Sequence, residues 1–282
     1  MRCALLVVLV ALVSLPITGC QEAQNLLSGL DKPGVTVAGV RFTDISLEHL
    51  DLNVDLEITN PYSVDLPVAA LDYDLGSSGQ SFLSGRSDNA ASIPANGKAT
   101  YPFAVRLPFA GLLNVLTEVK PGSAVPYEMA LGVHLDAPVV GAMRVPVEHA
   151  GELPVPAMPD VSVEDIYWKD ISLTNVAAVL KLGVGNTNDF PIDLSELGMR
   201  LNLAGTQIGN LGFNEAVGFA GGQKRQLEIP LSFSPMSVGS AVLNMLTGSG
   251  SGYSLDGLLK GSTKFGDIEL PFNRTGNTSF SR

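Results

Sequence analysis

The sequence predicts an all-β protein made of two tandem β-sandwiches, each with one short helix. Three observations lead to this prediction. Apolar and polar residues alternate along many short segments, which is the pattern of half-buried strands. The chain matches itself at an offset of 126 residues, as Asp44 and Asp170 show, and the matching unit of about 115 residues is a whole domain rather than a solenoid repeat. One segment in each copy has helical spacing instead.

Composition narrows the class of protein. The chain has 282 residues, of which 45% are hydrophobic and 16% charged, with 28 acidic against 17 basic residues and a net charge of -11. The apolar fraction excludes a disordered solvating chain. The negative charge argues against nucleic acid as a partner. The mean hydropathy of +0.26 is raised partly by the N-terminal segment.

Residues 1–19 are predicted to be an export signal. Arg2 precedes the apolar run from Ala4 to Leu15, which is shorter than the roughly 20 residues of a spanning helix. The segment ending at Cys20 reads Ile-Thr-Gly-Cys and resembles the bacterial lipobox. That resemblance implies cleavage before Cys20, lipidation of its sulfur and an anchor in the membrane. An ordinary export signal with an incidental cysteine is the alternative.

The same resemblance predicts where the mature protein lies. Gln21 follows the cysteine in place of Asp, which favours the outer membrane, on the side that faces the periplasm. Residues 20–33 then form a lipidated tether that reaches about 45 Å at most when extended. Because Cys3 is removed with the signal and Cys20 is blocked, thiol catalysis is excluded.

The repeat sets the domain boundaries at residues 34–150 and 160–275. Residues 151–159 contain three prolines and are predicted to be a semi-rigid linker, and residues 276–282 a polar tail. Further residues of the first copy recur 126 positions later, namely Val35, Val37, Leu56, Asn60, Leu71, Leu75, Gly79, Lys98 and Tyr127 as Val161, Val163, Leu182, Asn186, Leu197, Leu201, Gly205, Lys224 and Tyr253.

Within each copy the strands and the helix follow from residue spacing. The clearest strand runs through Leu50, Leu52, Val54, Leu56 and Ile58. Alternating strands of this kind must pair their apolar faces across a core, which favours a sandwich. The helical faces are predicted at Leu112, Val115, Leu116 and Val119 and, in the second copy, at Val238, Ala241, Val242 and Met245.

The segment from Leu56 to Pro67, with Asn60-Pro61 at its centre, resembles the signature of the type-2 late embryogenesis abundant family, whose module is the water-stress and hypersensitive-response domain. The resemblance covers residues 34–150 and extends to 160–275 through the repeat, where Thr187 replaces the proline. It implies immunoglobulin-like or fibronectin-III-like sandwiches of about seven strands. It also implies a protective or interaction role in desiccation, with no catalytic residues.

Asn60, Pro61 and Asn186 are interpreted as a structural turn motif. Asparagine bonds to its own backbone and tolerates turn conformations, while proline cannot continue a strand ladder. Contact with a ligand is the less favoured alternative for these residues.

No pattern of catalytic or metal-binding residues stands out, and we expect no catalytic residue, no cofactor and no metal. The three histidines, His49, His134 and His149, lack metal-ligand spacing. A Ser-His-Asp arrangement is not excluded, although no nucleophile-elbow pattern supports one. The glycine-rich stretch 247–252 lacks the ending of a phosphate loop.

Two predicted strand faces have more than one interpretation. Asp51, Asp55 and Glu57 share one strand face and Asp72 and Asp74 another, so that neighbouring strands would gather carboxylates for Ca²⁺; a solvated face is the plainer interpretation. In the second copy the positions equivalent to the first face are Asn175, Ala177, Val179, Lys181 and Gly183. This weakly charged face is a candidate surface for a protein or lipid partner or for domain 1.

The leading hypothesis is a non-enzymatic, membrane-anchored lipoprotein that protects or organises envelope components during water loss. The rival is a periplasmic module that carries or contacts a lipid or other hydrophobic ligand. A scaffold with a dedicated protein partner is a third possibility.

Overall fold

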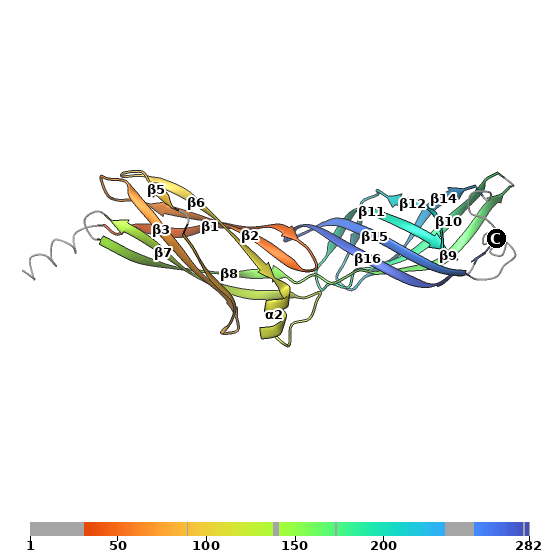
Figure 1. Ribbon diagram of the computed structural model, residues 1–282, viewed down its shortest axis with the longest axis horizontal. Helices are drawn as coiled ribbons and strands as arrows, with labels where there is room; N and C mark the ends of the chain where they lie inside the picture. Colours follow the sequence, from red (N-terminus) through yellow and green to blue (C-terminus); the bar gives the residue numbers. More distant parts are fainter. Residues whose placement is uncertain are drawn as a thin grey trace, which may run out of the picture.

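The computed structural model describes residues 31–88, 90–137, 141–172, 174–234, 251–278 and 280–281. These residues form two β-sandwiches that lie end to end along the long axis of the molecule, with the one described helix beside the joint (Figure 1). The predicted all-β tandem architecture is confirmed. Among the described residues, no helix is long and apolar enough to cross a membrane.

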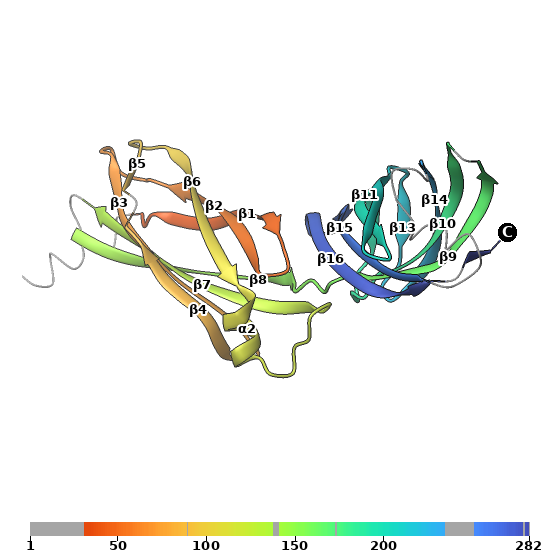
Figure 2. The same ribbon diagram turned by 45° about the vertical axis from the view of Figure 1, so that its right-hand side comes forward.

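Domain 1 consists of two antiparallel sheets that face each other (Figure 2). The smaller sheet is formed by β1 (Gly34–Ile45), β2 (His49–Thr59) and β6 (Lys98–Pro108). The larger sheet has the order β4 (Gln80–Ser87), β3 (Leu66–Ser77), β7 (Ala124–Ala137) and β8 (Gly141–Pro154), with the short β5 (Ala91–Ile93) beside β3.

Domain 2 repeats this order strand for strand. One sheet contains β14 (Lys224–Phe233), β10 (Val176–Gly185) and β9 (Asp160–Ile171). The other contains β12 (Thr206–Phe213), β11 (Ile192–Leu203), β15 (Ser251–Thr263) and β16 (Gly266–Thr278), with β13 (Val217–Phe219) beside β11. A final strand, β17 (Phe280–Ser281), pairs in parallel with the outer edge of β9.

The cores follow the alternating pattern of the sequence. The apolar residues of β2 point inward and are at most 1% exposed, whereas the residues between them face solvent. The corresponding strand β10 is buried on both faces over most of its length. The alternation therefore predicts the buried residues of β2 correctly, but it underestimates how many residues of β10 are buried.

The helix in domain 1, α2 (Phe109–Val115), is shorter than its periodicity predicts. It ends because Leu116 leaves helical geometry, with φ -95° and ψ 75°. Leu116 is nevertheless buried, and the amide of Val119 donates to its carbonyl in a turn. The apolar spacing thus continues through a turn after the helix has stopped. The helical positions predicted in the second copy, 238–245, lie outside the described residues.

Strand pairing runs further than the predicted boundaries. β8 continues to Pro154, four residues into the segment predicted as a linker, because it pairs with β7 as far as Ala124. In domain 2, β16 and β17 include residues predicted as the polar tail. Both extensions satisfy backbone groups that a free linker or tail would leave to solvent.

The two domains meet through edge-to-face contacts between aromatic rings and through a short backbone contact. The ring of Phe265, in the β15–β16 turn, lies 6.2 Å from that of Phe42 in domain 1 and 5.4 Å from that of Phe190 in its own domain. The amide of Asp189 donates to the carbonyl of Gly122 at 2.8 Å. These contacts tie domain 2 to the end of domain 1 that carries α2.

Candidate functional site

The asparagine predicted at the centre of the turn motif is a buried hydrogen-bond hub. Asn60 is 1% exposed, and its Nδ2 donates to the carbonyls of Val64, Ile93 and Pro94 at 2.8–3.1 Å. Its Oδ1 accepts from the amide of Tyr62 at 2.9 Å. The side chain therefore joins the end of β2 to the loop after β5. Its amide is used entirely by the protein's own backbone, which is the geometry of a structural turn.

Asn186 has the same role in domain 2. Its Nδ2 donates to Phe190 and Ala220, and its Oδ1 accepts from both nitrogens of Asn188. Thr187, which replaces the proline, donates from Oγ1 to the carbonyl of Met158 in the linker at 2.8 Å. The departure from the motif thus supplies a contact at the joint between the domains.

The β1–β2 turn brings a serine, a histidine and two aspartates together. Ser46 Oγ lies 3.2 Å from His49 Nδ1, and Asp44 Oδ2 lies 3.1 Å from His49 Nε2. However, Ser46 Oγ is in position to donate to the carbonyl of His49, and it accepts from the amide of the same residue. The hydroxyl caps the turn. This group of residues was not singled out from the sequence, although the spacing of positions 44, 46 and 49 is visible there.

The second copy serves as an internal control for that turn. Ser172 Oγ donates to the carbonyl of Asn175 and accepts from its amide, with the asparagine in the place of His49. The serine therefore keeps its turn contacts where no histidine is present. This equivalence supports a structural role and gives no support to a nucleophile in domain 1.

The carboxylates of β2 are paired with cations across the sheet. Both oxygens of Asp51 accept from Arg106 at 2.7 Å, which lowers the pKa of Asp51. Arg41 pairs with Asp55 and Lys98 with Glu57. Asp44, His49 and Asp51 also place potential metal-ligand atoms within 4.8 Å of one another, but the bidentate arginine already occupies Asp51. Ca²⁺ prefers six to eight oxygen ligands, which these residues do not offer.

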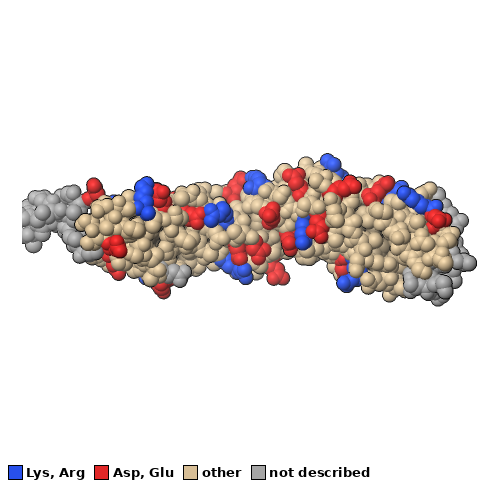
Figure 3. All heavy atoms as spheres, turned by 90° about the horizontal axis from the view of Figure 1, so that it is seen from above, with Lys and Arg blue, Asp and Glu red and all other residues tan. Residues whose placement is uncertain are grey.

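The idea that two acidic strands form one cation site is wrong. β2 belongs to the three-stranded sheet and β3 to the opposite sheet, so the outer faces of the two strands point away from each other. Cross-sheet placement is not visible in a pattern of alternation. Acidic and basic side chains alternate over the surface seen in Figure 3 rather than gathering into one acidic patch.

Asp72 organises the outer face of the larger sheet in domain 1. Its carboxylate accepts from His134 Nε2 at 2.6 Å and from Arg86 Nη1 at 2.9 Å, and Arg144 Nε lies at 3.5 Å. The hydrogen bond from His134 is the main reason why the pKa of Asp72 is lowered. Gly132, the register partner of Asp72 on β7, leaves the space that the Arg144 guanidinium fills. This network was missed because register is not visible in one strand.

Surface hollows in the described residues range from apolar to largely polar. One of about 500 Å³ lies over β7 and β8, next to Glu128, Glu148 and His149. Another of about 360 Å³ lies beside α2 and includes Ser77 and Glu118. His149 contacts the ring of Tyr127, whose pKa is raised by burial. The first hollow has a mixed lining of polar and apolar side chains, and the second has a mostly polar one. A hollow bounded by Pro159, Val184 and Phe219 is apolar, but its volume of about 10 Å³ is far below the roughly 300 Å³ of a ligand pocket.

The weakly charged face predicted in domain 2 is partly covered by the domain itself. Val179 is only 7% exposed and lies between its register partners Tyr167 and Pro230. A side chain above Gly183 would meet Glu164 and Lys224. Val179 therefore adds little exposed area to this face, whose role as a surface for a protein or lipid partner or for domain 1 stays a prediction.

Comparison with known proteins resolves the family. The family model described as late embryogenesis abundant protein, LEA type 2, matches residues 55–151 and 181–276. The chain belongs to this family. Each match falls within one sandwich, so the family module occurs twice in the chain.

Relatives with curated names match one copy's length of chain. A desiccation-related protein of Craterostigma plantagineum is 27% identical over 135 residues, which are 48% of this chain and 89% of the relative. A desiccation protectant protein of Glycine max is 26% identical over the same shares. The solution structure of an Arabidopsis thaliana protein, 25% identical, covers 46% of this chain and 86% of that one, with a TM-score of 0.39.

Proposed function

We propose that this chain is a non-enzymatic LEA type-2 protein that protects or organises components of the bacterial envelope during water loss. The observation that carries the proposal is the family match over both sandwiches, together with relatives that are named for desiccation. The described surfaces are in keeping with it. The polar groups singled out in each domain are engaged within the protein, as at Asn60 and Asp72 in domain 1 and at Asn186 in domain 2.

The proposal includes an anchor. Cleavage before Cys20 and lipidation of its sulfur would hold the protein on the periplasmic side of the outer membrane, as the lipobox-like segment and Gln21 predict. Several acyl chains, each methylene worth about 0.8 kcal/mol when buried, make such an anchor effectively permanent. Domain 1 would then lie within the reach of the tether, and domain 2 would extend from it.

The proposed protection depends on the charged side chains at the protein surface. In water, exposed carboxylates and their paired cations gain little from each other. As water is lost, the effective dielectric constant falls, so each exposed charge interacts more strongly with opposite charges on its own surface and on neighbouring molecules. A folded domain that carries both signs of charge, interspersed, would thus replace water at protein or headgroup surfaces without changing its own fold.

The test is survival after drying. A strain that lacks the gene should survive drying less well than its parent, and the wild-type chain should restore survival. The matched variant Cys20→Ser, which retains both domains, should restore it less well if the anchor matters. Equal survival of the deletion strain and the parent would overturn the proposed function. The anchor is checked separately by the mass of the mature N-terminal peptide, because an unacylated Cys20 would remove that part alone.

A binding module for hydrophobic ligands is the second candidate. The hollow beside α2 is mostly polar, the one over β7–β8 is mixed, and the apolar one next to Phe219 is too small for such a ligand, so the described hollows disfavour this function. Native mass spectrometry of the purified chain separates the two functions: a lipid that co-purifies in fixed ratio, beyond the acyl groups on Cys20, would favour carriage.

A further inference from the structure

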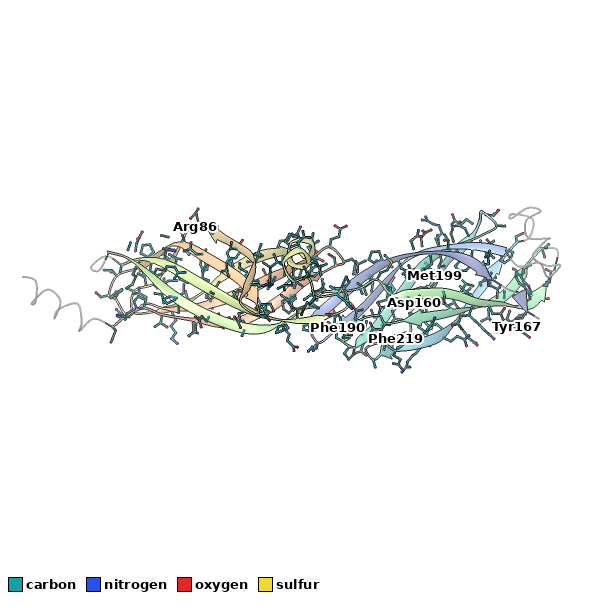
Figure 4. All side chains as sticks on the ribbon, turned by 90° about the horizontal axis from the view of Figure 1, so that it is seen from below. Arg86, Asp160, Tyr167, Phe190, Met199 and Phe219 are labelled. Carbon is teal, nitrogen blue, oxygen red and sulfur yellow. The ribbon has the colours of Figure 1, made fainter. Side chains whose placement is uncertain are left out.

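The linker between β8 and β9 is hydrogen-bonded to both domains as it crosses the joint, where Figure 4 shows Phe190. On one side, the amide of Val155 donates to the carbonyl of Ser123 in domain 1 at 2.9 Å. On the other side, the amide of Ala157 donates to Oδ1 of Asn188 in domain 2 at 2.8 Å. The linker can therefore move away from the domains only after these hydrogen bonds have opened.

Met158 is the residue of this linker whose side chain faces solvent. Its backbone carbonyl accepts from Oγ1 of Thr187 at 2.8 Å, but the residue is 41% exposed. Of the other methionines that the structure describes, Met129 and Met199 are at most 5% exposed and Met143 is half-buried. Among the described methionines, a small oxidant in solvent would therefore reach the sulfur of Met158 first.

A basic side chain of domain 2 contacts this sulfur. Arg274, on β16, places Nη1 3.6 Å from Sδ of Met158, and its Nη2 donates to the carbonyl of Pro159 at 3.3 Å. The guanidinium thus bridges a side chain and the backbone at the end of the linker. Because a thioether sulfur is only a weak hydrogen-bond acceptor, the contact with Met158 contributes little to holding the linker in place.

We propose that Met158 is an oxidation site, and that its sulfoxide binds Arg274 and ties the linker more firmly to domain 2. The oxidant is a peroxide. A lone pair of the thioether sulfur bonds to one oxygen of hydrogen peroxide as the O–O bond breaks, and the departing hydroxide takes the proton of the transferred hydroxyl and becomes water. The sulfur loses two electrons, the peroxide is reduced to water, and the product is methionine sulfoxide.

The exposure of Met158 determines the direction of the effect. Oxidation of a core methionine disrupts packing because it places a polar group among apolar ones. The oxidised side chain of Met158 stays in water, so this cost is absent. Its new oxygen is a full acceptor, and rotation of the exposed side chain brings it to about 2.8 Å from the guanidinium, the usual length of a charge-assisted hydrogen bond. Oxidation should therefore stabilise the closed linker.

The test is hydrogen–deuterium exchange of the full chain after partial oxidation with hydrogen peroxide, followed by peptide mass spectrometry. The added oxygen separates the oxidised and unoxidised linker peptides by mass, so both are measured in one sample. Met158 should be oxidised faster than Met129 and Met199. The amide of Ala157 should exchange about threefold more slowly in the oxidised form, because one additional hydrogen bond must break before the linker opens.

Three variants show whether the effect belongs to Met158 and Arg274. Met158→Leu retains an apolar side chain, and peroxide should leave the exchange of its linker unchanged even though methionines elsewhere are oxidised. Arg274→Leu removes the donor, so its oxidised and unoxidised peptides should exchange at the same rate. Met158→Gln supplies an oxygen acceptor in a side chain of similar length and should exchange as slowly as the oxidised wild type without any peroxide.

The outcomes that overturn the proposal are as sharply defined. It fails if peroxide oxidises Met199 as fast as Met158, if oxidised and unoxidised wild-type peptides exchange alike, or if the slower exchange persists in Arg274→Leu. The comparison within one wild-type sample and the result for Met158→Gln do not depend on how well Arg274→Leu folds. Urea unfolding curves of each variant show whether the two domains are intact.

Discussion

The two domains of this chain agree in their interior and differ on their surface. The first strand of each domain, β1 or β9, carries bulges at positions 126 residues apart, at Ala38 and Glu164 and again at Thr43 and Lys169. Both turns depend on a buried asparagine. The two copies share these features because the bulges set the bend of the strand and the asparagine ends its hydrogen-bond ladder.

The outer faces of the larger sheets have diverged. Asp72 and Arg86, which pair in domain 1, correspond to Gly198 and Gly212 in domain 2. His134 corresponds to Lys260, which lies 3.7 Å from two glutamates instead. The copies thus keep the positions that determine the fold and change those that meet solvent. Differences in partner or function between the two domains are therefore expected on these faces.

The largest effect should come from the shared turn. Asn60→Ala leaves three backbone carbonyls and one amide without their partner, and we expect domain 1 to lose about 3 kcal/mol of unfolding free energy. Urea unfolding followed by circular dichroism measures the loss, while the fluorescence of Trp168 reports on domain 2. Asn53→Ala is the control, because that exposed side chain makes a single bond to Thr43. A loss of unfolding free energy as small as that of the control would contradict the role of Asn60 as a buried hydrogen-bond hub.

The sequence predicts the parts of the fold that depend on local spacing. Alternation along β2 identifies the five core residues of that strand, and the motif locates Asn60 at a turn. The α2 periodicity finds the right residues but overstates the length, because Leu116 and Val119 stay apolar in a turn. The Asp72 network and the joint depend on register and on domain contact, which no single strand encodes.

A second prediction concerns the contact between the two domains. Gly122 has φ +99°, and a Cβ there would lie 2.7 Å from the carbonyl oxygen of Thr187. We expect Gly122→Ala to open the joint and to cost about 1–3 kcal/mol in backbone strain. Small-angle scattering and proteolysis of the linker measure the opening.

The control for Gly122→Ala is Gly79→Ala, which has the same backbone strain of a positive φ but no steric clash at its Cβ. Gly79 has φ +78° and no atom within 4 Å of its Cβ position. Gly79→Ala should therefore destabilise the β3–β4 turn and leave scattering unchanged. If both variants scatter like the wild type, the contact at Thr187 does not hold the joint.

Acid should affect the stability of the two domains differently because of Asp72. Its pKa is lowered in the folded protein, so its stabilisation is present above the ordinary value of 3.8 and is lost as pH falls through the folded pKa. Asp72→Asn should abolish this part of the acid dependence in domain 1. Domain 2, with Gly198 in that place, should not change. Unfolding curves at pH values on both sides of 3.8 test this, and an unaltered acid profile in the variant would exclude the network as its source.

The smallest effect is expected from the ion pair at the joint. Lys264 Nζ lies 2.6 Å from Glu152, but both side chains are more than half exposed, and such pairs contribute about 0.5 kcal/mol or less. Lys264→Met keeps an apolar stem over the ring of Phe265, where the ammonium now lies 4.7 Å from the centroid. The variant should therefore open the joint only slightly, and added salt should reduce the difference from the wild type. Proteolysis of the linker at low and high salt measures it. A large opening that salt does not reduce would mean that the lysine supports the joint through packing, as the aromatic residues do, rather than through charge.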